Sequence, residues 1–380
     1  MPVNTPRARG LDMRTRILIT ILALIGAVAC GYMSTLGHAA VKAMLDARSA
    51  DGDVESYTAA FHASLQERLR LVAATALIVA ACLIIARKRL DRAIARFTSD
   101  TRAFFSAARA ATSLLWKSTE GAERWAVLIL LLIAAALRIA QLDKAVIYDE
   151  AFTCTYYAVR PWYIIISDYS YPNNHILQTL LVKCSLALFG WGEVQARIPA
   201  FCAGMAALVL CWAWVRSNFG VNVAFFTLTL LAASRPLIEY SALARGYSIT
   251  WTCFLATLLL ARQFARTGNG FTGLLLALVN ALGMWAVPTM IYASAMVYAW
   301  MMLHVISGST TDRKRLIRSW LVSGSAFVLF TLVLYAPVIA VYGPGQLFYD
   351  ETMGPRSWAY FIASLEHRAR EFNTTLFDGR

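Results

Sequence analysis

The chain has 380 residues, of which 59% are hydrophobic and only 15% are charged. An ordinary globular protein is about 25% charged, so this composition excludes a soluble multidomain protein. It predicts an all-helical integral membrane protein with several spans. The net charge of +13 does not indicate nucleic acid, because the basic residues flank apolar segments as orientation signals do. Six of the seven cysteines lie in apolar segments and only Cys154 lies in a polar loop. This pattern matches neither a disulfide framework nor the spacing of a metal-binding site.

The first 124 residues predict a two-span hairpin followed by a basic cytoplasmic connector. Ile17–Leu36 follows four arginines and is long enough to cross a hydrocarbon core of about 30 Å, which indicates a retained anchor. The second predicted span is Leu71–Ala86. Residues 87–124 contain nine Lys or Arg, which places this segment inside. Its interleaved aromatic and basic residues fit either a helix on anionic lipid or a solvated connector.

The core, residues 125–342, begins with a span from Trp125 to Leu142 that leads to an external loop over residues 143–196. Within this loop Ile176–Phe189 is apolar but would reach only about 21 Å as a helix, which is short for a crossing. We predict an amphipathic interfacial helix here, because a crossing would move the later basic loops outside. The prediction is nine spans with the N-terminus inside and an external tail over residues 343–380. The remaining spans are predicted at Arg197–Val215, Val221–Tyr240, Tyr247–Ala261, Phe271–Val287, Thr289–Ile306 and Ser319–Tyr342.

Three predicted external segments carry side chains suited to chemistry. Asp149 and Glu150 directly follow a span, where carboxylates are either functional or simply solvated. Asn174 and His175 open the interfacial helix, either as capping residues or as contacts to a polar substrate. Arg245 suits a phosphate, or alternatively extends from a helix end toward water. Together they fit transfer of a group from a lipid phosphate to a polar acceptor, with a carboxylate taking the proton and a cation stabilising the phosphate.

Short motifs between about residues 125 and 264 carry a resemblance to a known family. The motifs are Asp149-Glu150, Tyr171-Pro172-Asn173-Asn174-His175, Leu188-Phe189-Gly190, Arg197-Ile198-Pro199-Ala200, Tyr240-Ser241 and Ala244-Arg245-Gly246-Tyr247-Ser248. In their order and spacing, this part of the chain resembles the polytopic glycosyltransferases of the C superfamily, which use polyprenyl-phosphate sugars. The branches it resembles most are the dolichyl-phosphate-mannose–protein mannosyltransferases, aminoarabinose transferases and rhizobial galacturonosyltransferases.

The resemblance implies an enzyme of the bacterial inner membrane with its active site facing the periplasm. It would move a sugar, with inversion, from a polyprenyl phosphate to a lipid, glycan or protein acceptor. Asp149 matches the general base, with Glu150 as a supporting acid or metal ligand. Asp168 is the best match to a second acid, although it stands four residues before Pro172, whereas the aminoarabinose branch has its acid almost against the proline.

For substrate binding, the resemblance points to the donor phosphate and to the polar groups beside it. Arg245 and Tyr247 match the phosphate-binding segment, and Asn174 and His175 match substrate contacts. It leaves the requirement for a divalent metal ion open. The membrane lipids themselves are the other expected partners.

Two alternatives stay open. A flippase for lipid-linked sugars would carry charged residues along a path through its spans, but here Arg138 lies only one turn from its helix end. An inactive, shortened relative acting as a partner subunit would fit the ending soon after Asp350-Glu351, where the family usually continues.

Overall fold

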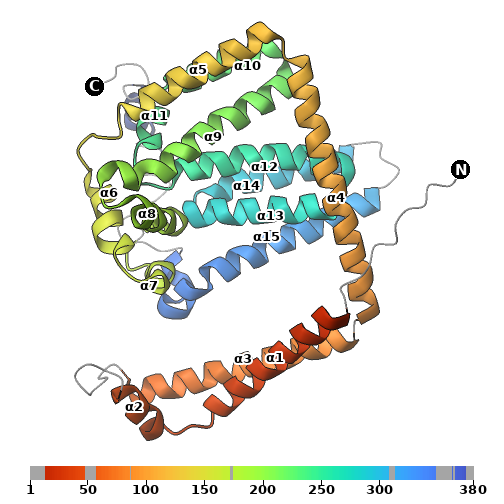
Figure 1. Ribbon diagram of the computed structural model, residues 1–380, viewed down its shortest axis with the longest axis vertical. Helices are drawn as coiled ribbons and strands as arrows, with labels where there is room; N and C mark the ends of the chain where they lie inside the picture. Colours follow the sequence, from red (N-terminus) through yellow and green to blue (C-terminus); the bar gives the residue numbers. More distant parts are fainter. Residues whose placement is uncertain are drawn as a thin grey trace, which may run out of the picture. The chain divides into compact units, whose positions relative to one another are not determined.

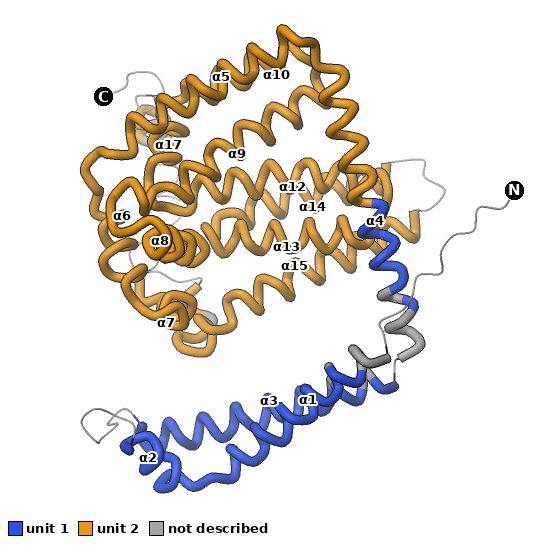
Figure 2. Tube along the Cα trace, in the orientation of Figure 1, with its two compact units in different colours: residues 1–103 blue, residues 104–380 orange. Residues whose placement is uncertain are grey.

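The computed structural model describes residues 13–47, 57–85, 87–171, 174–307, 313–347, 362 and 364–373, and these residues form helices without strands. The N-terminal arginines up to Arg9, Pro172-Asn173 and Asp350-Glu351 lie outside the described residues. Figure 2 shows two compact units, residues 1–103 and 104–380, which divide within helix α4. The helices are α1 (Met13–Met33), α2 (His38–Asp46), α3 (Ala59–Ile85), α4 (Arg87–Ser118), α5 (Gly121–Ile139), α6 (Tyr148–Phe152), η1 (Thr153–Ala158), α7 (Trp162–Ser167), α8 (Ile176–Phe189), α9 (Glu193–Phe219), α10 (Val221–Ala233), α11 (Arg235–Ser241), α12 (Tyr247–Thr267), α13 (Gly270–Ala286), α14 (Met290–Ser307), α15 (Arg313–Tyr342), η2 (Pro344–Leu347) and α17 (Leu365–Asn373).

The first unit is a helical hairpin in which α1 and α3 lie side by side (Figure 1). Small side chains, including Ala27 and Ala80, are buried between the two helices, while long apolar side chains such as Val28 point outward. The predicted helix over residues 17–36 ends earlier than expected, at Met33, and the chain turns by 101° into α2. The side chain of Gln66 in α3 fixes this turn by donating to the carbonyl of Leu36 at 2.8 Å.

The second half of α4 belongs to the second unit because its aromatic side chains pack there. Phe104 contacts the ring of Phe271 at the start of α13, with ring centroids 5.2 Å apart. Phe105 contacts Phe271 as well, at 6.1 Å. The compact unit therefore begins at Phe104, inside the predicted connector and ahead of the third predicted span.

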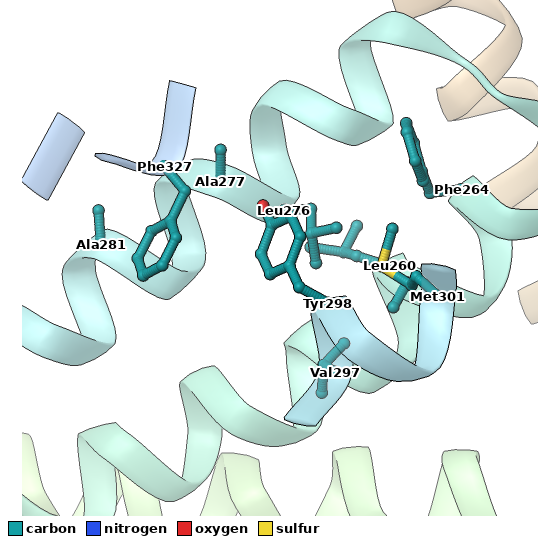
Figure 3. Close-up of a cluster of buried hydrophobic side chains, with 10 residues drawn as sticks. Leu260, Phe264, Leu276, Ala277, Ala281, Val297, Tyr298, Met301 and Phe327 are labelled. Atoms are coloured by element: carbon teal, nitrogen blue, oxygen red, sulfur yellow. The ribbon is translucent and has the colours of Figure 1, made fainter. Parts of the chain in front are cut away.

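The core of the second unit lies where α12, α13, α14 and α15 meet (Figure 3). Tyr298 of α14 stacks on Phe327 of α15 with 5.8 Å between centroids. Its hydroxyl lies 3.0 Å from that of Ser323, which donates at 2.7 Å to the carbonyl of Gly273 in α13. Gly273 allows this approach, because an added Cβ would lie 2.7 Å from the ring of Phe264. Small residues and a polar chain thus hold the four helices at close range.

Within the described residues, three helices are long and apolar enough to cross a membrane: α9, α14 and α15. The number rises to five if the bent pairs α1–α2 and α10–α11 each count as one span. Every predicted span lies largely on helix, and outward-facing leucines, isoleucines and valines are frequent along these helices. The structure thus confirms an all-helical protein with several candidate membrane helices.

The predicted continuous span Val221–Tyr240 is broken in the structure at Ser234, with a 62° bend between α10 and α11. Pro236 explains the break. Its ring clashes with the backbone carbonyl four residues earlier in a continuous helix, and proline has no N–H to donate to that carbonyl. The break leaves carbonyls without helical partners. Buried Arg138 of α5 donates to two of them, Ala232 at 3.3 Å and Leu231 at 3.4 Å. A cation at a helix C-terminus also opposes the negative end of the helix dipole.

Helix α8 has the bounds predicted from the sequence, Ile176–Phe189, but its polar side is turned into the protein. Lys183 donates to the carbonyls of Ala158 and Arg160 at 3.0 and 2.8 Å. The Ser185 hydroxyl donates to the backbone carbonyl of Gln195 at 2.6 Å. The exposed side instead carries apolar residues such as Leu188. The amphipathic pattern therefore reflects packing against η1 and α9, and the outward face of α8 is suited to hydrocarbon.

Candidate functional site

The candidate site lies where α6, the start of α8 and the turn before α12 meet, at the end of the long helices that α6, α7 and α8 cover in Figure 1. Helix α6 starts after the extended residue Ile147, so that Asp149 and Glu150 fall in its first turn. Negative side chains are favourable there because the backbone N–H groups of a first helical turn have no helical acceptors. These two adjacent acids face opposite environments.

Glu150 is buried in a clamp with Arg197, and each side chain is only 1% exposed. The Arg197 Nε and Nη2 atoms donate to the two carboxylate oxygens at 2.7 and 2.5 Å, and the backbone N–H of Ala244 donates to Oε1 at 2.8 Å. Arg197 Nη1 also donates to the carbonyls of Leu142 and Lys144. One buried ion pair thus ties α9 to α6, to the loop after α5 and to the turn before α12.

These contacts do not fit the predicted role of Glu150 as a supporting acid or metal ligand. Both carboxylate oxygens already accept hydrogen bonds, and a buried arginine neutralises the charge. We therefore assign Glu150 to positioning. The sequence prediction placed Arg197 in one of the family motifs but gave it no role in the site. The signal for its role is a charged side chain inside an apolar segment, which requires a buried partner.

Asp149 is the predicted acid that remains accessible. Its side chain is 52% exposed, and its Oδ2 lies 3.7 Å from Nη2 of Arg245, which is buried. The Arg245 guanidinium also lies 5.9 Å from the centroid of the Tyr247 ring. The structure therefore brings Asp149, Arg245 and Tyr247 together as the sequence predicted. It gives them one accessible carboxylate beside one fixed cation.

His175 supports this cation through the backbone. Its Nδ1 accepts a hydrogen bond from the N–H of Gly246 at 2.8 Å, and its ring meets Tyr247 edge to face. Burial, together with the charge of Arg245, lowers the pKa of His175 to about 3, so the imidazole is neutral and carries its proton on Nε2. Only glycine fits at Gly246, because a Cβ there would lie 2.6 Å from the carbonyl oxygen of Ala286. The sequence predicted that His175 contacts the substrate. In the structure its Nδ1 instead positions the backbone of Gly246, next to Arg245.

The side chain of Asn174 also makes its hydrogen bonds within the protein, where they hold the loop before α8 in place. Its Nδ2 donates to the carbonyls of Ile165 and Asp168 at 2.9 and 2.8 Å, and its Oδ1 accepts from Thr179 at 3.0 Å. The side chain is buried. The predicted substrate-contact role does not fit, because both Nδ2 donors and the Oδ1 atom are engaged within the protein.

Asp168 lies in a separate polar network. Its Oδ1 accepts from the backbone and hydroxyl of Ser170 and from the hydroxyl of Tyr342, while Arg160 pairs with Oδ2 at 2.8 Å. Burial opposes the charged carboxylate, but the hydrogen bonds from Ser170 and Tyr342 and the charge of Arg160 together lower the pKa of Asp168. These contacts tie the loop before α8 to the end of α15. They do not fit a second catalytic acid, which would need an accessible oxygen.

Aromatic rings cluster on the elements that carry the site, and the sequence prediction did not include most of them as site residues. Tyr240 lies 4.7 Å from Tyr247 between centroids, and it is partly exposed. On the side of α6 and η1, Phe152 stacks on Tyr156 at 4.6 Å and meets Tyr171 at 5.2 Å. The signal in the sequence was the density of tyrosines between residues 148 and 171.

Asp149 is the exposed carboxylate of the site, and its charged neighbour is the guanidinium of Arg245 at 3.7 Å. A divalent metal ion here would need further oxygen ligands, which substrate phosphates and water supply in many Mg²⁺ sites. Within the described ranges, no group of three or more His, Cys, Asp or Glu side chains is placed to hold a metal.

No protein-family model matches the chain, and comparisons with curated proteins and with solved structures gave no match. The family resemblance therefore stays a prediction from the motifs quoted above.

Proposed function

We propose that the protein is a membrane glycosyltransferase that moves a sugar from a polyprenyl phosphate to a cell-envelope acceptor, which is a lipid, a glycan or a protein. The supporting observation is the pairing of accessible Asp149 with buried Arg245. Three segments that are far apart in the sequence meet at this pair: the backbone next to Arg245 is held by Glu150 on one side and by His175 on the other.

The pair supplies the two charges that a direct displacement needs. Asp149 takes the proton from the acceptor hydroxyl while the hydroxyl oxygen of the acceptor forms a bond to the anomeric carbon of the sugar. The bond from that carbon to the phosphate oxygen breaks, and the electron pair leaves with the polyprenyl phosphate. Arg245 stabilises the charge on the departing phosphate. One displacement with a single carboxylate gives inversion at the anomeric carbon.

We further propose the predicted orientation, with nine spans and the site on the outer face of the bacterial inner membrane. Helix order supports it. Helices α9 and α12 start near the site, with Arg197 in the second turn of α9 and Tyr247 as the first residue of α12, and they carry Arg216 and Arg266 in their last turns. Helix α15 starts in a basic segment at Arg313 and ends at Tyr342, which bonds to Asp168 beside α8. The basic ends thus lie opposite the site, as the positive-inside rule requires.

The test is sugar transfer from radiolabelled polyprenyl-phosphate sugars in membranes that contain wild type or Asp149→Asn. Loss of a general base predicts a rate lower by about 10²- to 10⁴-fold at equal protein abundance. Asp143→Asn is the matched control, since Asp143 is an exposed acid of the same loop, and it should retain the wild-type rate. Equal transfer by wild type and Asp149→Asn would remove Asp149 from the chemistry. Donor binding without transfer by any variant would favour a carrier or a non-catalytic subunit.

A further inference from the structure

A cavity lies between α4, α5 and α9, and none of the candidate site residues lines it. It has a volume of about 570 Å³, within the usual range of roughly 300–1,000 Å³ for sites that hold small molecules. Its walls are almost entirely apolar, with Leu115 on α4, Leu128 and Leu131 on α5, and Trp212 on α9. A cavity of this size and polarity is suited to a hydrocarbon chain.

Two residues that line this cavity, Arg124 and Trp212, each have a buried donor atom without a partner. In the part of the chain that the structure describes, neither Nε of Arg124 nor the indole Nε1 of Trp212 has a hydrogen-bond acceptor. An unpaired buried donor costs about 1–3 kcal/mol, so such atoms call for an acceptor that enters the cavity. The rest of the Arg124 side chain is fixed, with Nη2 donating to the carbonyl of Trp116 at 2.6 Å and the guanidinium 4.2 Å from that ring.

This corner carries one more basic than acidic side chain, with Lys117, Arg124 and Arg216 against Glu120 and Glu123. Glu123, the acid next to Arg124 in the chain, is engaged by Arg216 at 2.8 Å. Arg124 makes no ion pair with a carboxylate among the described residues, and Lys117 stands in the last turn of α4. Trp116 and Trp125, both largely exposed, flank the opening. Tryptophan beside arginine is typical of the boundary between hydrocarbon and headgroups.

From these features we infer that the cavity binds an anionic phospholipid of the inner leaflet. One acyl chain lies among the leucines of α4 and α5, and a phosphate oxygen accepts from Arg124 Nε and Trp212 Nε1. This inference depends on the proposed orientation in the membrane but not on sugar transfer, so either can fail alone. The bound lipid would join α4 to the bundle at its cytoplasmic end.

The test is native mass spectrometry of the full chain, released from micelles that contain equal amounts of phosphatidylglycerol and phosphatidylcholine. Wild type should retain phosphatidylglycerol in preference by about tenfold, because both lipids offer a phosphate but only phosphatidylglycerol brings a net negative charge to Arg124 and Lys117. Arg124→Gln should lose most of that preference. Arg109→Gln, an exposed arginine on the same helix but outside the cavity, should keep it.

Two further variants keep the test decisive if Arg124→Gln disturbs the end of α4. Trp212→Phe removes only the indole donor, which either phosphate would accept, so it should lower retention of both lipids by about threefold and leave the preference unchanged. Leu128→Trp fills the cavity and should reduce retention of any lipid there. Equal retention of the two lipids by wild type, or equal losses in Arg124→Gln and Arg109→Gln, would overturn the inference.

Discussion

The clamp of Glu150 with Arg197 and the corner between α4 and α5 differ in whether their buried polar atoms have partners. At the candidate site, every nitrogen of the Arg197 guanidinium and both oxygens of Glu150 have partners. At the corner between α4 and α5, Arg124 and Trp212 each keep a buried donor without one. Satisfied networks fix geometry, which a reacting centre needs. Unsatisfied donors beside an apolar cavity instead define a place where a ligand completes the structure.

The largest expected effect comes from removing one partner of the buried clamp. Arg197→Met leaves the carboxylate of Glu150 buried without its cation, which costs about 3–5 kcal/mol of folding free energy. The matched control is Arg235→Met, because the pair of Arg235 with Glu239 is about half exposed and such pairs contribute about 0–1 kcal/mol. Thermal unfolding in detergent measures both. Similar midpoints for the two variants would contradict the clamp.

A methyl group at Gly246 tests how tightly the backbone beside Arg245 is held. Gly246→Ala should cost about 3 kcal/mol, the upper end for overpacking, since the atom it meets is a backbone carbonyl oxygen and not the end of a flexible side chain. Gly324→Ala is the control: its Cβ would meet only an ordinary contact, 3.9 Å from Tyr298. Unfolding midpoints should fall for the first and stay equal or rise for the second. A neutral Gly246→Ala would show that the turn before α12 adapts.

The neutral state of His175 predicts a pH dependence with a definite sign. Its folded pKa of about 3 lies below the usual value near 6.5, so the unfolded chain takes up a proton that the folded chain does not. Its stabilising contribution is complete above about pH 6.5 and decreases as the pH falls toward 3, by roughly 2 kcal/mol at pH 5. His175→Asn keeps an acceptor for Gly246 but does not titrate. Its unfolding midpoint should change less between pH 7 and 5 than that of wild type, and an unchanged slope would contradict the assignment.

The smallest expected effect is at Asp168. Tyr342→Phe removes one of its hydrogen bonds and leaves those from Ser170 and Arg160, which predicts a loss of about 1 kcal/mol. The measurement is again the unfolding midpoint. Sugar transfer should stay near the wild-type rate, because the contacts of Asp168 are structural. A large loss of transfer with an unchanged midpoint would return Asp168 to the chemistry.

Hydropathy predicted where the apolar helices lie, because an apolar segment long enough to cross a membrane must form a helix there. It did not predict the break at Ser234, because the apolar segment already had the length of one continuous span. Pro236 was the residue that indicated a break. In the site, the accessible Asp149 and Arg245 were predicted from residue type and position. The clamp of Glu150 with Arg197 was not, because two charges 47 positions apart reveal their pairing only once α6 and α9 pack.

The contact of Arg138 with the end of α10 has a consequence for how the chain is made. Helix α5 leaves the ribosome more than ninety residues before the carbonyls of Leu231 and Ala232 that Arg138 needs. Until those carbonyls arrive, a guanidinium in an apolar helix must reach for water at the boundary. We therefore expect α5 to settle at its final depth only after α10 and α11 have been synthesised, so that insertion of this protein is cooperative rather than strictly sequential.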